Sequence, residues 1–272
     1  AYGPLDTQTS GRLSATSDTG ISSDDGITRN NLPTFDGQTS PGATVELVAT
    51  NQAGTSEPII LGQTTAGADG RWVISTSTHL ADGTYTVVMN VNRGTDQLNR
   101  VLMGNATGAG SSLVIDTVAP QISQVGYNIS TGQIRINAQD FGSGIDRNSF
   151  GAAGNYQVMS LAGRNAGQII NPATFRMVST TSYPEVTYNM ILDRRSGPRP
   201  RRVQLSLNTA DLSDSAGNTF EGQSTYVLTN SRIIRQLPKG VAATIMNSRK
   251  DTSLANKILN WILPTGARTP RF

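Results

Sequence analysis

The sequence contains no cysteine, which excludes disulfide bonds and metal sites built from thiolates. Its single histidine, His79, leaves almost no basis for a structural zinc site. No apolar run approaches the roughly 20 residues that a membrane-spanning helix requires. The chain begins at Ala1 without a methionine or a signal-peptide pattern, so we expect a processed protein or a segment of a longer one.

Turn-forming residues are abundant instead. The sequence has 28 glycines and 12 prolines, and its hydrophobic content of 36% is too high for general disorder. Apolar and polar residues alternate over short segments, separated by turn sequences such as SPGA, AGADG and LADG. This pattern is typical of antiparallel β-sandwiches. The segments are 43–49, 71–75, 84–91 and 113–115 in the first half, and 133–138, 156–159, 186–192 and 202–207 in the second.

A helical period occurs only near the end of the chain. The segment 252–263 predicts a short helix that ends before Pro264. Its apolar face consists of Leu254, Ile258, Trp261 and Ile262. A helix of this length needs a surface to pack on. The second sandwich, a partner protein and a membrane surface are the alternatives.

Several longer motifs in the first half carry a resemblance to a known family. In chain order they are SDTGISSDDGIT, LPTFDG, PGATVELV, GADGRW, LADGTYTV and IDTVAP. Residues 12–120 resemble one bacterial Ig-like repeat of large extracellular adhesins. The later segments QDFGSGID and DLSDSAGN resemble an opening loop and a late turn of more divergent Ig-like domains. The resemblance implies an all-β chain of two tandem Ig-like β-sandwiches.

The expected organisation has four parts. They are the end of a preceding repeat or a linker (1–11), an Ig-like β-sandwich (12–117), a second, divergent Ig-like β-sandwich (118–231), and a basic C-terminal extension with the short amphipathic helix (232–272). Leu5-Asp6-Thr7 resembles Ile115-Asp116-Thr117, which indicates a slice of a tandem array with neighbouring Ig-like domains. A chance match of three residues is the alternative.

Acidic residues gather where the resembled adhesin repeats commonly bind Ca²⁺ at domain junctions. The resemblance therefore implies structural Ca²⁺ at two sites. One consists of Asp116, Asp140 and Asp146, and the other of Asp6, Asp18, Asp24 and Asp25. Carboxylates in glycine-rich loops suit Ca²⁺, which takes six to eight oxygen ligands. The alternative is that these aspartates only close Asx-turns.

Charge is distributed unevenly along the chain. Residues 1–117 contain 11 acidic and 5 basic side chains, whereas residues 118–272 contain 8 acidic and 17 basic ones. Five arginines lie within nine residues: Arg194, Arg195, Arg199, Arg201 and Arg202. They form either a solvated loop or a contact for an anionic surface polysaccharide or an acidic protein. Nucleic acid is not expected as a partner, because no aromatic residues alternate with the arginines.

No motif predicts catalysis. The sequence lacks a GxSxG nucleophile motif, and His79 lies in a predicted turn, so we expect no enzyme. The predicted function is a structural or adhesive module of a bacterial extracellular or cell-surface protein, a Ca²⁺-stiffened Ig-like spacer or adhesin segment. The alternative is an accessory binding module that anchors a secreted enzyme or a surface layer to an anionic polymer.

Overall fold

The computed structural model describes residues 9–53, 57–103, 112–179, 185–192, 199–229 and 231–236 of the 272-residue chain. Its contacts divide the chain into two compact units. Unit 1 consists of Ala1–Pro120 together with two loops of the second half, Gln139–Asp146 and Leu212–Phe220, and unit 2 of the remaining residues. Each of these two loops contributes a residue to the site described below.

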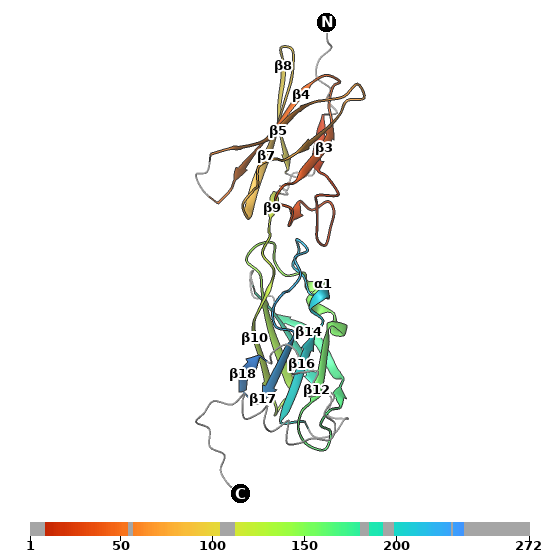
Figure 1. The fold of residues 1–272 in the computed structure, drawn as a ribbon, viewed down its shortest axis with the longest axis vertical. Helices are drawn as coiled ribbons and strands as arrows, with labels where there is room; N and C mark the ends of the chain where they lie inside the picture. The colour runs from red at the N-terminus through yellow and green to blue at the C-terminus, as the bar shows by residue number, and fades with distance from the viewer. Residues whose placement is uncertain are drawn as a thin grey trace. The chain divides into compact units, whose positions relative to one another are not determined.

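Unit 1 contains two sheets. A three-stranded sheet has the order β1-β3-β6, and in a six-stranded sheet β2-β9-β7-β4-β5 follow one another while β8 also pairs with β7. Figure 1 labels β3 of the first sheet and β4, β5, β7, β8 and β9 of the second. The strands are β1 (Ser10–Leu13), β2 (Ile27–Thr28), β3 (Thr34–Gln38), β4 (Thr44–Asn51), β5 (Ile59–Thr65), β6 (Arg71–Ser75), β7 (Gly83–Arg93), β8 (Asp96–Met103) and β9 (Leu113–Ile115). All described pairs in unit 1 are antiparallel except β2 with β9, which is parallel.

The alternation of apolar residues explains how these two sheets pack. Along β4 every second residue is fully buried, and β7 continues the same core (Val45, Leu47, Ala49, Tyr85, Val87, Met89 and Val91). Phe35 of β3 and Ile74 of β6 enter this core from the other sheet. Since both sheets contribute to one apolar core, unit 1 is a β-sandwich, as the period of two predicts.

Trp72 is accommodated by two glycines. Gly11, Gly37 and Trp72 lie side by side on β1, β3 and β6, and Trp72 is 2% exposed. A Cβ atom on Gly37 would collide with the Trp72 ring and with the Ser10 carbonyl, and one on Gly11 would also collide with the ring. The two missing side chains therefore provide the volume that the indole fills.

We expect Gly37→Ala to destabilise unit 1 by about 1–3 kcal/mol, the usual cost of overpacking a core. Thermal unfolding followed by circular dichroism measures the effect. Gly126→Ala is the matched control, because Gly126 also lies in a strand but has no atom within 4 Å of an added Cβ. Equal melting temperatures for both variants would contradict the packing described for Trp72.

Unit 2 also contains two sheets. Their orders are β10-β11-β15-β14 and β13-β12-β16-β17-β18. The strands are β10 (Gln121–Asn128), β11 (Gln133–Gln139), β12 (Tyr156–Ser160), β13 (Ile169–Ile170), β14 (Pro172–Ser179), β15 (Glu185–Leu192), β16 (Arg202–Leu207), β17 (Thr225–Thr229) and β18 (Ser231–Gln236). Among the described residues of this unit, the single-turn helices are α1 (Arg147–Gly151), η1 (Ala153–Asn155) and η3 (Thr209–Asp211).

Aromatic rings fill part of the core of unit 2. The ring centroids of Tyr156 and Phe175 are 4.8 Å apart, and those of Phe175 and Tyr188 are 6.1 Å apart. Tyr156 donates a hydrogen bond from its hydroxyl to the Phe150 carbonyl at 2.7 Å, which ties α1 to this cluster. The rings thus connect strands of both sheets with the short helix.

The all-β class and the two sandwiches that the sequence predicts are confirmed. The predicted helix over 252–263 lies outside the described residues. Among the residues that the structure does describe, no helix is long and apolar enough to cross a membrane.

Candidate functional site

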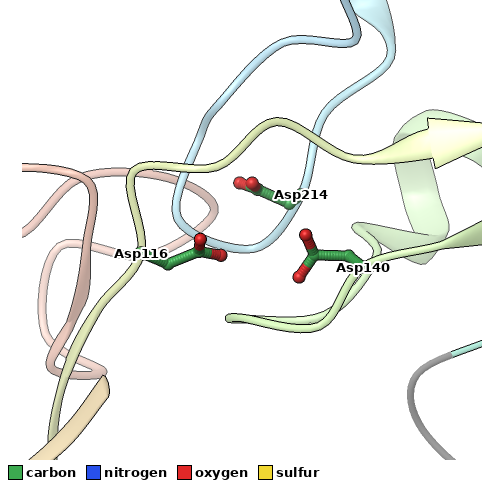
Figure 2. A group of neighbouring side chains, drawn as sticks. All are labelled: Asp116, Asp140 and Asp214. Carbon is green, nitrogen blue, oxygen red and sulfur yellow. The ribbon is translucent and has the colours of Figure 1, made fainter. Parts of the chain in front are cut away.

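Three buried aspartates of unit 1 come together from distant parts of the sequence. Asp116 directly follows β9, Asp140 follows β11, and Asp214 lies between η3 and β17. Their exposed fractions are 1%, 3% and 0%. One carboxylate oxygen from each lies within 4.8 Å of the other two, and Figure 2 shows the three side chains on three separate segments. We call these residues the carboxylate triad.

Backbone amides orient two carboxylates of the triad. Asp116 accepts hydrogen bonds from the Val118 amide at 3.1 Å and from the Ser143 amide at 2.6 Å. Asp140 accepts from the amides of Gly142 at 3.1 Å and Gly144 at 2.6 Å. A Cβ on Gly142 would overlap the Asp116 carboxylate, so the loop approaches Asp116 only because this position is a glycine.

The third carboxylate is held by a tight turn. Asp214 accepts hydrogen bonds from the amide and from the side-chain nitrogen of Asn218, both at 2.8 Å. The same side-chain nitrogen donates to the Asp116 carbonyl at 2.8 Å. Gly217 adopts a φ of +88°, which favours glycine. The turn therefore positions Asp214 against Asp116 by direct hydrogen bonds.

The triad concentrates negative charge without a basic partner. Burial raises the pKa of Asp214 to about 6 and also raises the pKa of Asp140, and the charge of Asp116 raises both further. The ion pairs Arg12–Asp36 and Arg71–Asp69 do not include a member of the triad. Two carboxylates about 4 Å apart repel by about 4 kcal/mol at an effective dielectric of 20. A bound cation would relieve this repulsion.

The donors of the triad fit a hard divalent cation. All three are carboxylate oxygens, which Ca²⁺ prefers, and Ca²⁺–oxygen bonds of about 2.4 Å allow two ligands of one ion to lie up to about 4.8 Å apart. The triad meets this limit. The glycine cradle at position 142 also keeps aliphatic atoms away from the Asp116 oxygens. The residues present therefore suit Ca²⁺.

Of the aspartates predicted as one Ca²⁺ site (Asp116, Asp140 and Asp146), the structure brings Asp116 and Asp140 together, and the third member of the group is Asp214. Asp146 is 8% exposed and lies outside the triad. Ile145, the residue before Asp146, forms a β-bridge with Asp214. The sequence feature that could have indicated Asp214 is the segment DSAGN, a tight-turn sequence that begins with this aspartate.

The acidic loop of the first sandwich has a different arrangement. Asp18 is 5% exposed, and one of its oxygens accepts from the Gly26 amide at 3.1 Å while the other has no hydrogen-bond partner. Burial raises the pKa of Asp18 to about 6, with further contributions from the charges of Asp25 and Asp24. Within the described part of the chain these three do not form a group comparable to the triad. Asp6, the fourth predicted ligand, lies outside the described residues.

The predicted arginine contact is described only in part. Arg194 and Arg195 lie outside the described residues. Arg201 is exposed, whereas Arg202 at the start of β16 and Arg199 are half-buried. Arg199 donates a hydrogen bond from its guanidinium to the Ser130 carbonyl, and a Cβ on Gly132 would overlap this guanidinium. Arg199 therefore packs against a turn of its own unit.

We expect Arg199→Ser to lower the free energy of unfolding of unit 2 by about 1 kcal/mol, because it removes a charge-assisted hydrogen bond and the packing of the side chain. Arg201→Ser is the matched control and should change this free energy by less than about 0.5 kcal/mol, as is usual for exposed positions. Urea unfolding measures both. A cost at Arg201 equal to that at Arg199 would show that the guanidinium contact with Ser130 is not the cause.

Two β-sandwiches in one chain, with a carboxylate triad at the end of the first, define a multidomain β-sandwich protein. The family can be stated for the first sandwich: residues 5–117 match the family model of the bacterial Ig-like domain. The interpretation of this half as a bacterial Ig-like repeat is confirmed. Domains of this family are typically structural modules rather than enzymes.

Similar solved structures include a biofilm-associated protein (its BSP domain), with 15% identity and a TM-score of 0.22. That match covers 75% of this chain and 28% of the other, so the chain spans less than a third of that protein's length. Tandem Ig domains of titin have 11% identity, coverages of 74% and 88%, and a TM-score of 0.25. Bovine butyrophilin has 10% identity, coverages of 72% and 89%, and a TM-score of 0.26. None of the curated proteins matches the sequence.

Proposed function

We propose that the chain is a structural module of a bacterial extracellular or cell-surface protein, an Ig-like spacer or adhesin segment stiffened by Ca²⁺ at the carboxylate triad. The observation that carries this proposal is the burial of three carboxylates within ligand distance of one another, without an ion pair to any described residue. The family match of residues 5–117 supports the structural role.

The triad suggests what Ca²⁺ would stiffen. Asp116 belongs to the end of β9, whereas Asp140 and Asp214 belong to the loops Gln139–Asp146 and Leu212–Phe220. A bound ion would hold the peptide after β9 to both loops. With Kd values of about 0.1–1 mM, typical of extracellular modules, about 1 mM Ca²⁺ adds roughly 0.4–1.4 kcal/mol to stability. This is small beside the roughly 5–15 kcal/mol of a typical folded domain, so we expect the ion to restrain the peptide after β9 rather than to drive folding.

Isothermal titration calorimetry of the whole chain tests this proposal. Chelator-treated protein should release or absorb heat on titration with Ca²⁺, and its melting temperature should rise with Ca²⁺ concentration. Mg²⁺ should bind more weakly, because it demands octahedral geometry and keeps its water ligands. No heat and no thermal shift at 5 mM Ca²⁺, a concentration well above the affinity range assumed (about 0.1–1 mM), would refute the cation site.

We also propose a second Ca²⁺ site at Asp18, Asp24 and Asp25, with Asp6 as a further ligand. The supporting observation is the buried Asp18 oxygen that lacks a hydrogen-bond partner. The titration distinguishes one site from two by its stoichiometry, and Asp18→Asn should remove only the second site.

The alternative function is attachment to an anionic polymer or to an acidic protein. The excess of basic side chains in residues 118–272 favours it, with 17 against 8 acidic ones. A binding module should bind a purified anionic surface polysaccharide at low salt and release it as salt screens the charges, whereas a spacer should not bind it.

A further inference from the structure

A loop of the first sandwich lies against the turn that carries Asp214. The Thr19 hydroxyl donates a hydrogen bond to the Ala216 carbonyl at 2.7 Å, and the Ile21 amide donates to the Ser215 carbonyl at 3.2 Å. All these residues belong to unit 1. Arg29 completes the contact, because its guanidinium donates to the Gly217 carbonyl. Three consecutive carbonyls after Asp214 are therefore bound by one loop.

The two backbones approach as closely as glycine allows. Gly20 has a φ of +95°, and a Cβ there would overlap the Ser215 carbonyl. A Cβ on Gly217 would lie 2.9 Å from the Gly20 Cα atom. Side chains at either position would push the turn away, so the contact depends on both glycines.

The same loop also holds the backbone of Asp116. The Asp116 amide donates to the Thr28 carbonyl at 2.9 Å, within the parallel pairing of β2 and β9. Thr19 connects the two contacts, since its hydroxyl oxygen accepts from the Arg29 amide at 2.9 Å while it binds Ala216. The segment between Thr19 and Arg29 thus binds the backbone of Asp116 directly. It also binds the turn that carries Asp214.

We propose that Thr19 and Arg29 are positioning residues of the carboxylate triad: they set the place of Asp214 relative to Asp116 and so determine the affinity for the cation. This inference rests on the proposed Ca²⁺ site. Neither side chain contacts a triad carboxylate among the described hydrogen bonds. Thr19 and Arg29 both precede Asp214 by more than 180 positions in the sequence. Groups that orient metal ligands typically contribute 10- to 100-fold to affinity.

Two variants test the proposal by calorimetry on the whole chain. Thr19→Val removes the hydroxyl at nearly constant volume, and Arg29→Gln removes the guanidinium. Each should bind Ca²⁺ about 10-fold more weakly than the wild type with unchanged stoichiometry. The matched controls are Thr34→Val, whose hydroxyl contacts only Ser75, and Arg12→Gln, whose guanidinium pairs with Asp36. Both controls should keep the wild-type affinity, and Arg29→Lys should restore part of it.

The dependence of stability on Ca²⁺ separates positioning from a merely structural role. The variant is expected to have a lower unfolding free energy than the wild type. If its Ca²⁺ affinity is 10-fold lower, this difference is about 1.4 kcal/mol larger in saturating Ca²⁺ than in chelator. A structural role alone gives the same deficit under both conditions, and that result would overturn the inference. Unchanged affinity in both variants would overturn it while leaving the Ca²⁺ site intact. A wild type that binds no Ca²⁺ would refute the site itself and the inference with it.

Discussion

Replacement of Asp214 by asparagine is expected to abolish Ca²⁺ binding at the carboxylate triad, whereas Asp146→Asn should leave it unchanged. Asparagine has nearly the same shape as aspartate but removes one of three buried negative charges, and Ca²⁺ affinity depends strongly on ligand charge. We expect a loss of roughly 100-fold or more, which places the site beyond detection at millimolar Ca²⁺. Titration calorimetry of both variants measures the difference.

Stability without metal provides the control for this pair. In chelator Asp214→Asn should unfold at a temperature close to that of the wild type, because the substitution also removes the repulsion among buried carboxylates. On addition of Ca²⁺ its melting temperature should then rise less than that of the wild type, because only the proposed site at Asp18, Asp24 and Asp25 can still bind the ion. If Asp146→Asn lost binding and Asp214→Asn kept it, the grouping of Asp116, Asp140 and Asp214 would not be the cation site.

Acidification should stabilise the chelated protein more than the Ca²⁺-loaded protein. The folded-state pKa is raised to about 6 for both Asp18 and Asp214, above the ordinary value of 3.8. Between pH 6 and pH 3.8 the folded state therefore binds more protons than the unfolded state, and the stability of the chelated protein rises as pH falls. From pH 7 to pH 5 the gain is up to about 1 kcal/mol for each group, less where solvent screens it.

Protons and Ca²⁺ compete for the same carboxylates, so Ca²⁺ affinity should fall steeply below pH 6. Chemical unfolding at pH 7 and pH 5, with chelator and with 5 mM Ca²⁺ (above the roughly 0.1–1 mM Kd of extracellular sites), measures both trends. The double variant Asp18→Asn, Asp214→Asn should lose most of the pH dependence in chelator. If the wild type and this variant lost the same amount of stability between pH 7 and pH 5 in chelator, the raised pKa values would be contradicted.

The sequence predicts the sandwiches well because their signals are local. The alternation in 43–49 and 84–91 becomes β4 and β7, whose facing residues pair over the full length of β4. The two-residue strand β2 is too short to give a period, and its parallel pairing with β9 joins residues far apart in the sequence. The packing of Trp72 also cannot be predicted from the local sequence, because Gly11 and Gly37 come next to it only through strand pairing.

The site is predictable only to the extent that its residues lie in recognisable motifs. Asp116 occurs in IDTVAP, which resembles the closing linker of the repeat, and Asp140 in QDFGSGID, which resembles an opening loop. Asp214 is brought to them by hydrogen bonds of Asn218 across about 100 residues, and no periodicity encodes such a contact. Asp146 was the nearest acidic residue in the sequence. Proximity along the chain therefore did not indicate which aspartate completes the triad.

The divided origin of the triad has a consequence for how such chains diversify. Asp116 comes from the first half, whereas Asp140 and Asp214 come from the second. Recombination that replaced one half alone would keep only one or two of the three carboxylates. It would also remove the hydrogen bond from Asn218 to the carbonyl of the original Asp116. Adjacent halves are therefore expected to be inherited and duplicated as matched pairs, with selection acting on the pair rather than on a single repeat.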